Sequence, residues 1–286
     1  MAERFTAHPR FPGLWETEVT RQRGDGRETT RDWISVEEPL SVSVDEDVLA
    51  TTMRTPGSDR ELALGLLFAE SVINCRGDIG SVSHCGRPGD EGYGNVIEVR
   101  SAPGVSLNIA DGSPARRGTL STSACGVCGR RTIDDLLERC GVVKPLSMAS
   151  RAIVSAIAAL TAGQQMHRLS GGLHAAGLAE PGGSVCVAFE DVGRHNAVDK
   201  LVGHLLLKSE DDERAPARGK LLVVSGRTSF EIVQKAARAG FGAVAGVSAP
   251  SSLAIQTAER AGILLCGFVR EGRLNAYTFP ERLLDE

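Results

Sequence analysis

The second half of the chain alternates short apolar segments with helical ones, and this alternation constrains the fold more than any other feature. Phe230–Ala239 and Ser251–Ala261 have helical spacing, and each is followed by a glycine, which readily takes the left-handed conformation that ends a helix. Strands that alternate with helices in this way form a largely parallel sheet. The predicted buried strands of this α/β domain are Val185–Phe189, Leu221–Val224, Ala243–Val247 and Ile263–Phe268.

The first half has a different pattern, in which glycine-rich segments separate short alternating stretches. Pro39–Asp45 alternates apolar and polar residues and predicts a half-buried strand, while Ser58–Glu61 has the sequence of a capping box that opens a helix. Asn95–Val99 and Val105–Ile109 predict two further strands. Residues 1–30 are polar and broken by proline and glycine, which indicates a mobile tail or an edge hairpin. We therefore expect this tail over residues 1–30, a small α+β domain over 31–120 and the α/β domain over 121–286.

Composition excludes several classes of protein. Hydrophobic residues make up 42% and charged residues 24% of the 286, as in ordinary globular domains rather than disordered or coiled-coil chains. A net charge of −4 supplies no basic field for nucleic acid. No apolar run reaches the roughly 20 residues that a membrane helix needs. The first residues show no signal peptide, so we expect a cytoplasmic protein that binds neither nucleic acid nor membrane.

The chain has seven cysteines, an odd number that in a reducing compartment indicates thiols rather than a disulfide framework. Cys186 and Cys266 lie within apolar runs and are expected in buried strands. Cys125 and Cys128 instead form a CxxC with a glycine after each thiol, just before the helical pattern that starts at Thr132. A helix N-terminus favours the thiolate, which is the nucleophile in sulfur chemistry. The spacing favours a reactive thiol pair, over half of a zinc site or two inert thiols.

Polar segments follow three of the predicted strands at the point where each strand ends. Glu190–Lys200, Ser225–Ser229 and Ser248–Ser252 stand at these junctions. If the strands are parallel, the junctions share one edge, where ligands of α/β sheets bind. Free backbone N–H groups, hydroxyls and two arginines there suit a phosphate, although serines at such positions also serve simply as helix caps. The candidate ligand-binding residues are Glu190, Asp191, Arg194, His195, Ser225, Arg227, Ser229, Ser248 and Ser251.

A further candidate is the predicted hairpin at Phe268–Arg273, which carries two arginines and an aromatic ring. Such a group clamps a nucleotide base and its phosphate, or simply forms an edge hairpin with solubilising charges. His174, in Gly172–Gly177, has the setting of a packed loop histidine rather than of a ligand. The phosphate-binding pattern GxxxxGK[ST] is absent from the sequence.

Taken in order, the motifs resemble those of the FdhD family, the formate dehydrogenase accessory sulfurtransferases. The resemblance runs from about residue 35 to residue 280 and leaves residues 1–30 outside it. Several motifs in one order are more specific than a single CxxC. The motifs are Glu38–Leu40, Arg54–Gly57, Cys125–Gly129, Gly172–Ala176, Glu190–Lys200, Ser225–Ser229, Ser248–Ser252 and Gly272–Tyr277.

The resemblance implies a function. Members of this family take persulfide sulfur from a cysteine desulfurase and pass it to the Mo-bis(molybdopterin guanine dinucleotide) cofactor, which then serves formate dehydrogenase. Carried over by position, Cys125 is the persulfide carrier and Cys128 its assisting thiol. The guanine dinucleotide cofactor is thus a bound acceptor, with no permanent metal, and the expected partners are the desulfurase, the formate dehydrogenase apoenzyme and a second copy of the chain in a homodimer. The family's cofactor-binding stretch falls on Phe268, Val269, Arg270, Glu271, Gly272 and Arg273.

The family's second domain resembles the cytidine-deaminase fold, so we expect a three-layer α/β/α domain with the CxxC loop at its start. The zinc signature of the deaminases is not matched, because His174 is followed by two alanines rather than by a glutamate two residues on, and no proline precedes Cys125. Two alternatives stay open: a zinc-dependent nucleoside hydrolase that uses Cys125, Cys128 and His174, and a non-catalytic chaperone of the molybdenum cofactor. In the sulfurtransferase, Glu190, Asp191 and His195 orient the cofactor or move protons.

Overall fold

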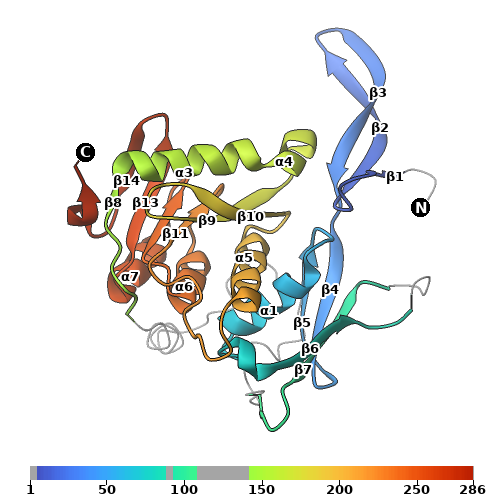
Figure 1. Ribbon diagram of the computed structural model, residues 1–286. Coiled ribbons are helices and arrows are strands. Elements are labelled where there is room, and N and C mark those ends of the chain that lie inside the picture. Colours follow the sequence, from blue (N-terminus) through green and yellow to red (C-terminus); the bar gives the residue numbers. More distant parts are fainter. Residues whose placement is uncertain (1–4, 88–92, 108–141, 286) are drawn as a thin grey trace.

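The computed structural model describes residues 5–87, 93–107 and 142–285 (Figure 1). It is a mixed α/β structure with several sheets. None of the helices in these ranges is long and apolar enough to cross a membrane.

A six-stranded sheet forms the centre of the second half, in the order β10-β9-β11-β12-β13-β14. Strands β11, β12 and β13 are parallel, and β9 is antiparallel to both β10 and β11, so β10 runs in the same direction as these three. The parallel arrangement predicted from the sequence is therefore confirmed for β10 to β13, whose carboxyl ends share one edge. The strands are β9 (His174–Ala179), β10 (Val185–Asp191), β11 (Leu221–Val224), β12 (Ala243–Gly246), β13 (Leu264–Arg270) and β14 (Arg273–Ala276).

Helices cover both faces of this sheet (Figure 1). Helix α3 (Ser150–Gly163) packs on the face to which Leu221 and Val223 point. The opposite face, which includes Leu222 and Val224, packs against α5 (Arg194–Lys208), α6 (Phe230–Ala239) and α7 (Ser252–Ala261). Helices α6 and α7 end at Gly240 and Gly262, both in the left-handed region, as the sequence predicts. The short helix α4 (Gln165–Ser170) follows α3.

The first half contains a four-stranded sheet, in the order β5-β4-β7-β6, against which helix α1 (Asp59–Ala69) packs. The capping box predicted at Ser58 is wrong: Ser58 is the N-cap, but its φ is 56° and its side chain makes no cap hydrogen bond. Residues 105–107 lie outside any strand, and the rest of that predicted strand is outside the described residues. The four strands are β4 (Glu38–Val44), β5 (Asp47–Arg54), β6 (Ile79–His84) and β7 (Val96–Ser101).

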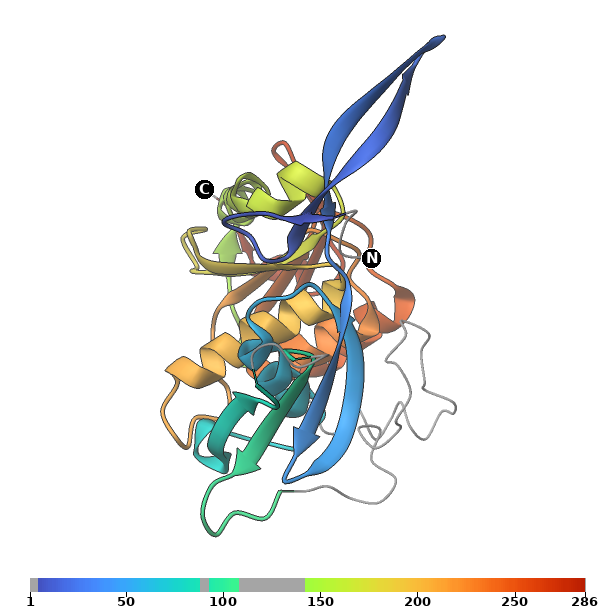
Figure 2. The same ribbon diagram turned by 90° about the vertical axis from the view of Figure 1, so that its right-hand side faces the viewer.

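The segment expected to be a tail or an edge hairpin forms a hairpin. Strands β2 (Leu14–Arg23) and β3 (Gly26–Ser35) pair from Leu14↔Ser35 to Arg23↔Gly26, and the short β1 (Thr6–Ala7) joins them. This hairpin projects from the body of the molecule (Figures 1 and 2). Its base is held to α4 by a 2.8 Å hydrogen bond between the hydroxyls of Ser35 and Ser170. Two short strands, β8 (Met148–Ala149) and β15 (Leu283–Leu284), pair near the C-terminus.

The two halves share one hydrophobic core, because α1 and α5 cross at backbone contact distance. A Cβ atom on Gly65 would lie 1.9 Å from the carbonyl oxygen of Asp199, and one on Gly203 would lie 1.9 Å from that of Glu61. Only glycine fits at either position, since real Cβ contacts are never this short. The crossing fixes the α/β half against the four-stranded sheet.

The two cysteines predicted in buried strands differ. Cys266, in β13, is buried as expected, and burial raises the pKa of its thiol to about 12. The prediction for Cys186 is wrong, since its side chain is exposed. Cys186 lies on β10, an outer strand of the sheet, where alternate side chains face solvent.

Candidate functional site

The carboxyl ends of β10 to β13 form an edge that we call the rim: residues 192–195, 225–229, 248–251 and 268. Main-chain hydrogen bonds hold these segments together. Thr228 donates to the carbonyl of Ala249, Ser251 donates to that of Thr228, and Phe268 donates to that of Ser248, at 3.2, 3.0 and 3.2 Å. The structure thus brings together the polar junctions that the sequence placed on one edge.

Two arginines and a histidine meet at the rim. Arg194 opens α5, Arg227 lies exposed after β11, and His174 is the first residue of β9. A Cβ atom on Gly226 would lie 3.2 Å from His174 Nδ1 and 4.0 Å from Arg194 Cδ. Both side chains therefore lie close to the main chain of Gly226. Burial, and then Arg194, lower the pKa of His174, so this side chain is neutral at neutral pH.

Two buried polar atoms at the rim have no partner among the described residues. They are the Nε of Arg194 and the Oγ1 of Thr228, a residue with no exposed surface. Leaving a buried donor unpaired costs about 1–3 kcal/mol, so these two atoms make the rim a candidate ligand site. An anion suits the rim, because the guanidinium groups of Arg194 and Arg227 lie beside a neutral histidine.

His195 links α5 to the start of α6. Its Nε2 lies 3.0 Å from Ser229 Oγ, and its Nδ1 lies 3.0 Å from Glu231 Oε2. Burial, followed by the positive charges of Lys235 and Arg194, lowers the pKa of His195 to about 3. The neutral ring therefore donates from Nδ1 to the glutamate and accepts the Ser229 hydroxyl proton at Nε2, leaving the Ser229 oxygen free to accept another hydrogen bond.

The serines of the rim divide between capping and other roles. Ser251 is a helix cap, because its Oγ accepts the N–H of Ala254 at 3.2 Å. Ser229 occupies the N-cap position of α6 but makes no side-chain cap, since its hydroxyl bonds His195. Ser225 Oγ accepts the N–H of Ala175 at 2.8 Å and so ties β9 to the end of β11. The capping interpretation thus holds for Ser251 alone among these three.

The Phe268–Arg273 hairpin stands at the end of β13. A β-bulge between Gly267 and Arg270 turns Phe268 outward, with φ 51° and 36% of the residue exposed, while Val269 is buried in the core. The turn at Glu271 and Gly272 has φ values of 42° and 78°, and Arg270 and Arg273 face each other as an exposed cross-strand pair. Bulges commonly re-aim a side chain beside a binding site.

Asp191 was grouped with the ligand-binding residues by its place in the sequence, but the structure turns it into the interior. Its carboxylate is fully buried and lies 2.7 Å from Lys200 Nζ. It also accepts hydrogen bonds from the N–H groups of Gly193 and Thr55 and from Asn196 Nδ2, at 2.8, 3.2 and 3.0 Å. No lone pair is left for a ligand, so Asp191 positions the chain.

Lys200 and Asn196 complete this cluster. Lys200 Nζ donates to the carbonyl of Thr55 at 2.8 Å, and Asn196 Nδ2 donates to that of Met53 at 2.7 Å. We call Thr55, Asp191, Asn196 and Lys200 the buried joint. It ties the end of β5 to the start of α5, and so links the two halves of the molecule.

Glu190 also lies away from the rim. Its two carboxylate oxygens accept the N–H groups of Met166 and His167, at 3.0 and 2.7 Å, at the start of α4. The carboxylate is therefore used to fix that short helix. Cys125 and Cys128 lie outside the described residues, and within the described ranges no group of three or more His, Cys, Asp and Glu side chains could hold a metal ion.

Sequence reasoning missed His174, which it treated as a packed loop residue. The structure places it at the rim because β9 runs antiparallel and begins where its neighbours end. The pairing of His174 with Asp191 across β9 and β10 brings this about. The available signal was the Gly172–Ala176 motif, since it stands among the motifs that carry the family resemblance.

Comparisons with known proteins agree with one another. The sequence model of the FdhD/NarQ family matches residues 35–284. A protein named sulfur carrier protein FdhD from Anaeromyxobacter sp. (strain K) is 52% identical, over 89% of this chain and 90% of its own. Another of that name, from Corynebacterium efficiens, is 41% identical over 96% of this chain and 98% of its own.

A solved structure shares the fold. The crystal structure of a protein from Desulfotalea psychrophila, assigned as a formate dehydrogenase accessory protein, superposes with a TM-score of 0.74. The match covers 96% of this chain and 100% of that one, at 24% sequence identity.

Proposed function

Because the chain belongs to the FdhD/NarQ family, we propose that it is a sulfur carrier for the maturation of formate dehydrogenase. It accepts persulfide sulfur from a cysteine desulfurase on Cys125 and delivers it to Mo-bis(molybdopterin guanine dinucleotide), the substrate of the transfer. The observation that carries this proposal is the 52% identity, over nearly the whole chain, to a protein named sulfur carrier protein FdhD.

The first step is an exchange at sulfur. The Cys125 thiolate attacks the outer sulfur of the desulfurase persulfide, an S–S bond forms on Cys125, and the donor cysteine leaves as a thiolate. No net oxidation or reduction occurs, because one persulfide replaces another. A free cysteine has a pKa near 8.5, and the arginines at 130 and 131 favour the attacking thiolate.

The second step releases the sulfur. The Cys128 thiol attacks the inner sulfur of the Cys125 persulfide, which forms a Cys125–Cys128 disulfide and frees the outer sulfur as hydrogen sulfide. The two thiols supply the two electrons that reduce the sulfur to sulfide, and the sulfide binds the acceptor metal in exchange for an oxygen ligand that leaves as water. A cellular thiol reductant then restores both cysteines.

The rim supports the acceptor side of the proposal. The buried Nε of Arg194 has no partner in the described parts of the chain, Arg227 is exposed nearby, and the hairpin adds Phe268 and an exposed arginine pair. Guanidinium groups bind phosphates through paired hydrogen bonds, and an exposed ring suits stacking on a base. We assign the guanine nucleotide ends of the substrate to this rim, where bringing donor and acceptor together contributes most of the rate.

The finer features of the proposal come from the family resemblance. They are action in the cytoplasm, a homodimer, docking to a cysteine desulfurase and to the formate dehydrogenase apoenzyme, and a cytidine-deaminase-like arrangement of the α/β half. Helices on both faces of the six-stranded sheet support that last assignment.

The test is intact-mass analysis of the full chain after incubation with a cysteine desulfurase and cysteine. We expect one added sulfur atom, removed by a thiol reductant and mapped to Cys125. Cys125→Ala stays unloaded, whereas Cys186→Ala, which removes an exposed thiol on β10, loads normally. Loading of Cys125→Ala to the wild-type level would falsify the carrier assignment.

A client assay separates the alternatives. A sulfur carrier with Cys125→Ser yields inactive formate dehydrogenase that still contains metal and pterin. If that variant supports full client activity, the protein is a chaperone of the cofactor. Stoichiometric zinc in purified protein, lost on replacing Cys125, Cys128 or His174, would instead identify a zinc hydrolase.

A further inference from the structure

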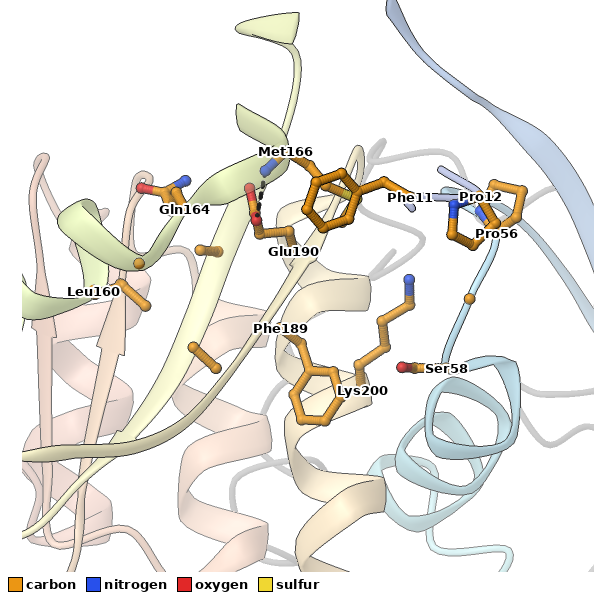
Figure 3. A pocket seen from close by; sticks show the side chains of 14 residues that line it. Phe11, Pro12, Pro56, Ser58, Leu160, Gln164, Met166, Phe189, Glu190 and Lys200 are labelled. Atoms are coloured by element: carbon orange, nitrogen blue, oxygen red, sulfur yellow. Dashed lines mark hydrogen bonds between the residues drawn. The ribbon is translucent and has the colours of Figure 1, made fainter. Parts of the chain in front are cut away.

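A cavity of about 380 Å³ lies beside β10 (Figure 3), and none of the rim residues lines it. Besides residues of β9, β10 and α5, it is lined by the end of α3, the start of α4, the loop before α1 and residues just before β2. Its volume falls within the roughly 300–1,000 Å³ of small-molecule sites. The residues that matter for its chemistry are Phe11, Ser58, Gln164, Phe189 and Lys200.

Much of the cavity wall is apolar and aromatic. The side chains of Phe11 and Phe189 lie on opposite sides of the space in Figure 3, with Pro12 and Pro56 on the Phe11 side. Met166 closes the upper side near Phe11. Flat ligands are favoured between such surfaces, because ring faces and prolines offer contact area with little loss of conformational freedom.

Three side chains in the cavity wall offer donor groups with spare capacity. Gln164 is only 4% exposed, and its Nε2 has no hydrogen-bond partner within the described parts of the chain. Lys200 uses two of its three N–H groups, on Thr55 and Asp191. The Ser58 hydroxyl makes no cap bond to its helix. Glu190 also lines the cavity, and each of its carboxylate oxygens already accepts one N–H at the start of α4, which leaves each oxygen one further lone pair for a ligand donor such as a ring N–H.

We propose that this cavity binds a flat heteroaromatic ring that carries a carbonyl oxygen, the class that includes pterins and purines. A carbonyl acceptor satisfies the buried Gln164 amide, which a purely apolar ligand would leave unpaired. A simple anion is disfavoured, because Asp191 already balances the charge of Lys200 at 2.7 Å and a second buried negative charge would have no counter-ion.

This inference rests on the proposed function and extends it, since the proposed substrate carries both pterin and guanine rings. Ala175 connects the two places: it lines the cavity, and its N–H donates to Ser225 Oγ at the rim. A large substrate with its nucleotide ends at the rim therefore has a second, ring-sized binding place one strand away.

The experiment titrates neopterin, guanosine and indole, a flat ring without a carbonyl, into the purified full chain by calorimetry. Ala188→Phe fills the cavity from an exposed position on β10, and Gln164→Leu removes the side-chain amide that would donate to the ligand. Cys186→Phe, two positions along the same strand and also exposed, is the matched control.

We expect wild type and Cys186→Phe to bind neopterin or guanosine, and indole not to bind. Ala188→Phe abolishes that binding, and Gln164→Leu weakens it about tenfold, as expected for one hydrogen bond in a buried site. The ring that binds identifies which part of the substrate the cavity takes. Thermal unfolding of each variant verifies that it is folded, and the two variants test the cavity separately.

The inference is overturned if neither carbonyl-bearing ring binds, if indole binds equally well, or if Ala188→Phe binds as the wild type does. If Ala188→Phe binds guanosine as tightly as wild type does, guanosine binds at the rim, and the result counts against the cavity. Sulfur loading of Cys125 is measured on the same samples. A chain that loads sulfur but binds no ring refutes only the cavity, and one that binds the ring but never loads sulfur refutes only the proposed carrier function.

Discussion

The buried joint and the rim draw on the same stretch of chain, Glu190–Lys200, yet their polar atoms are in opposite states. In the joint, the carboxylate of Asp191 has four protein partners, including Lys200. At the rim, a few residues away, the buried Nε of Arg194 has none among the described residues. The carboxylate that links the two halves is saturated by the fold, whereas the arginine proposed to bind the ligand keeps a donor unused. Substitutions should therefore separate stability from binding.

The largest effect is expected in the joint. Lys200→Met leaves the Asp191 carboxylate buried without a counter-charge, and breaking a buried pair in this way costs about 3–5 kcal/mol. Urea unfolding of the full chain measures the loss. Lys220→Met is the control: Lys220 also pairs with a carboxylate, Glu180, but its side chain is 34% exposed. Surface pairs contribute about 0–1 kcal/mol, so equal losses in the two variants would refute the special role of the joint.

The helix crossing beside the joint comes next. Gly203→Ala places a methyl group 1.9 Å from the carbonyl oxygen of Glu61, so α1 and α5 must move apart. Overpacking of this kind costs about 1–3 kcal/mol by denaturant unfolding. Gly163→Ala, at the end of α3 with open space around it, should be neutral or up to about 1 kcal/mol stabilising. A harmless Gly203→Ala would mean that the crossing tolerates separation.

Substitutions at the rim should weaken ligand binding and leave the fold stable. Arg194→Gln removes a buried Nε that has no partner among the described residues, so it should not lower the free energy of unfolding, and loss of the unpaired donor raises it by up to about 1–3 kcal/mol. It should weaken binding of guanosine diphosphate about tenfold, through one lost charge-assisted hydrogen bond. Arg260→Gln, in the last turn of α7 at the end remote from the rim, is the control and should bind as the wild type does. Unchanged affinity in Arg194→Gln would remove this arginine from the site.

The smallest expected effect is on pH dependence. The pKa of His195 is lowered to about 3 in the folded chain, from 6.5 in the unfolded one, so between these values the unfolded state binds the extra proton and stability falls as pH falls. Burial raises the pKa of Asp199 from 3.8 to about 6, which acts in the opposite direction between those values. Comparing wild type with His195→Asn cancels the Asp199 contribution. The difference in unfolding free energy between wild type and His195→Asn should shrink by about 1 kcal/mol when the pH is lowered from neutral to one unit below 6.5. A difference that stays constant over this range would contradict a neutral His195.

Sequence patterns predicted the α/β half well where local signals agree. Leu221–Val224 and Phe230–Ala239 match their observed ends, because an apolar run, a polar junction and a closing glycine mark each boundary. Strand β9 was not predicted, and neither its presence nor its antiparallel insertion between β10 and β11 leaves a clear mark in a short run of alanine, glycine and leucine. His174 was missed for that reason. Cys186 was misplaced because an outer strand has the same alternation as a central one.

It was also not predictable which residues of Glu190–Lys200 would be buried in the joint and which would lie at the rim. Asp191 and Arg194 are both charged and three residues apart, and nothing local says which of them turns inward. The answer depends on Lys200, two helical turns further along, and on Thr55 in the other half of the molecule. Residue type alone identified the stretch, while long-range pairing assigned the roles.

The crossing of α1 with α5 has a consequence for how the chain melts. Because side chains from both sheets meet in one core around that crossing, neither half keeps its apolar surface covered when separated from the other. We expect a single calorimetric transition rather than two, and an isolated C-terminal fragment should bind hydrophobic dyes and aggregate. Occupancy of the rim would then raise the melting temperature of residues as distant as β4, since ligand binding to one part of a cooperative unit stabilises the whole.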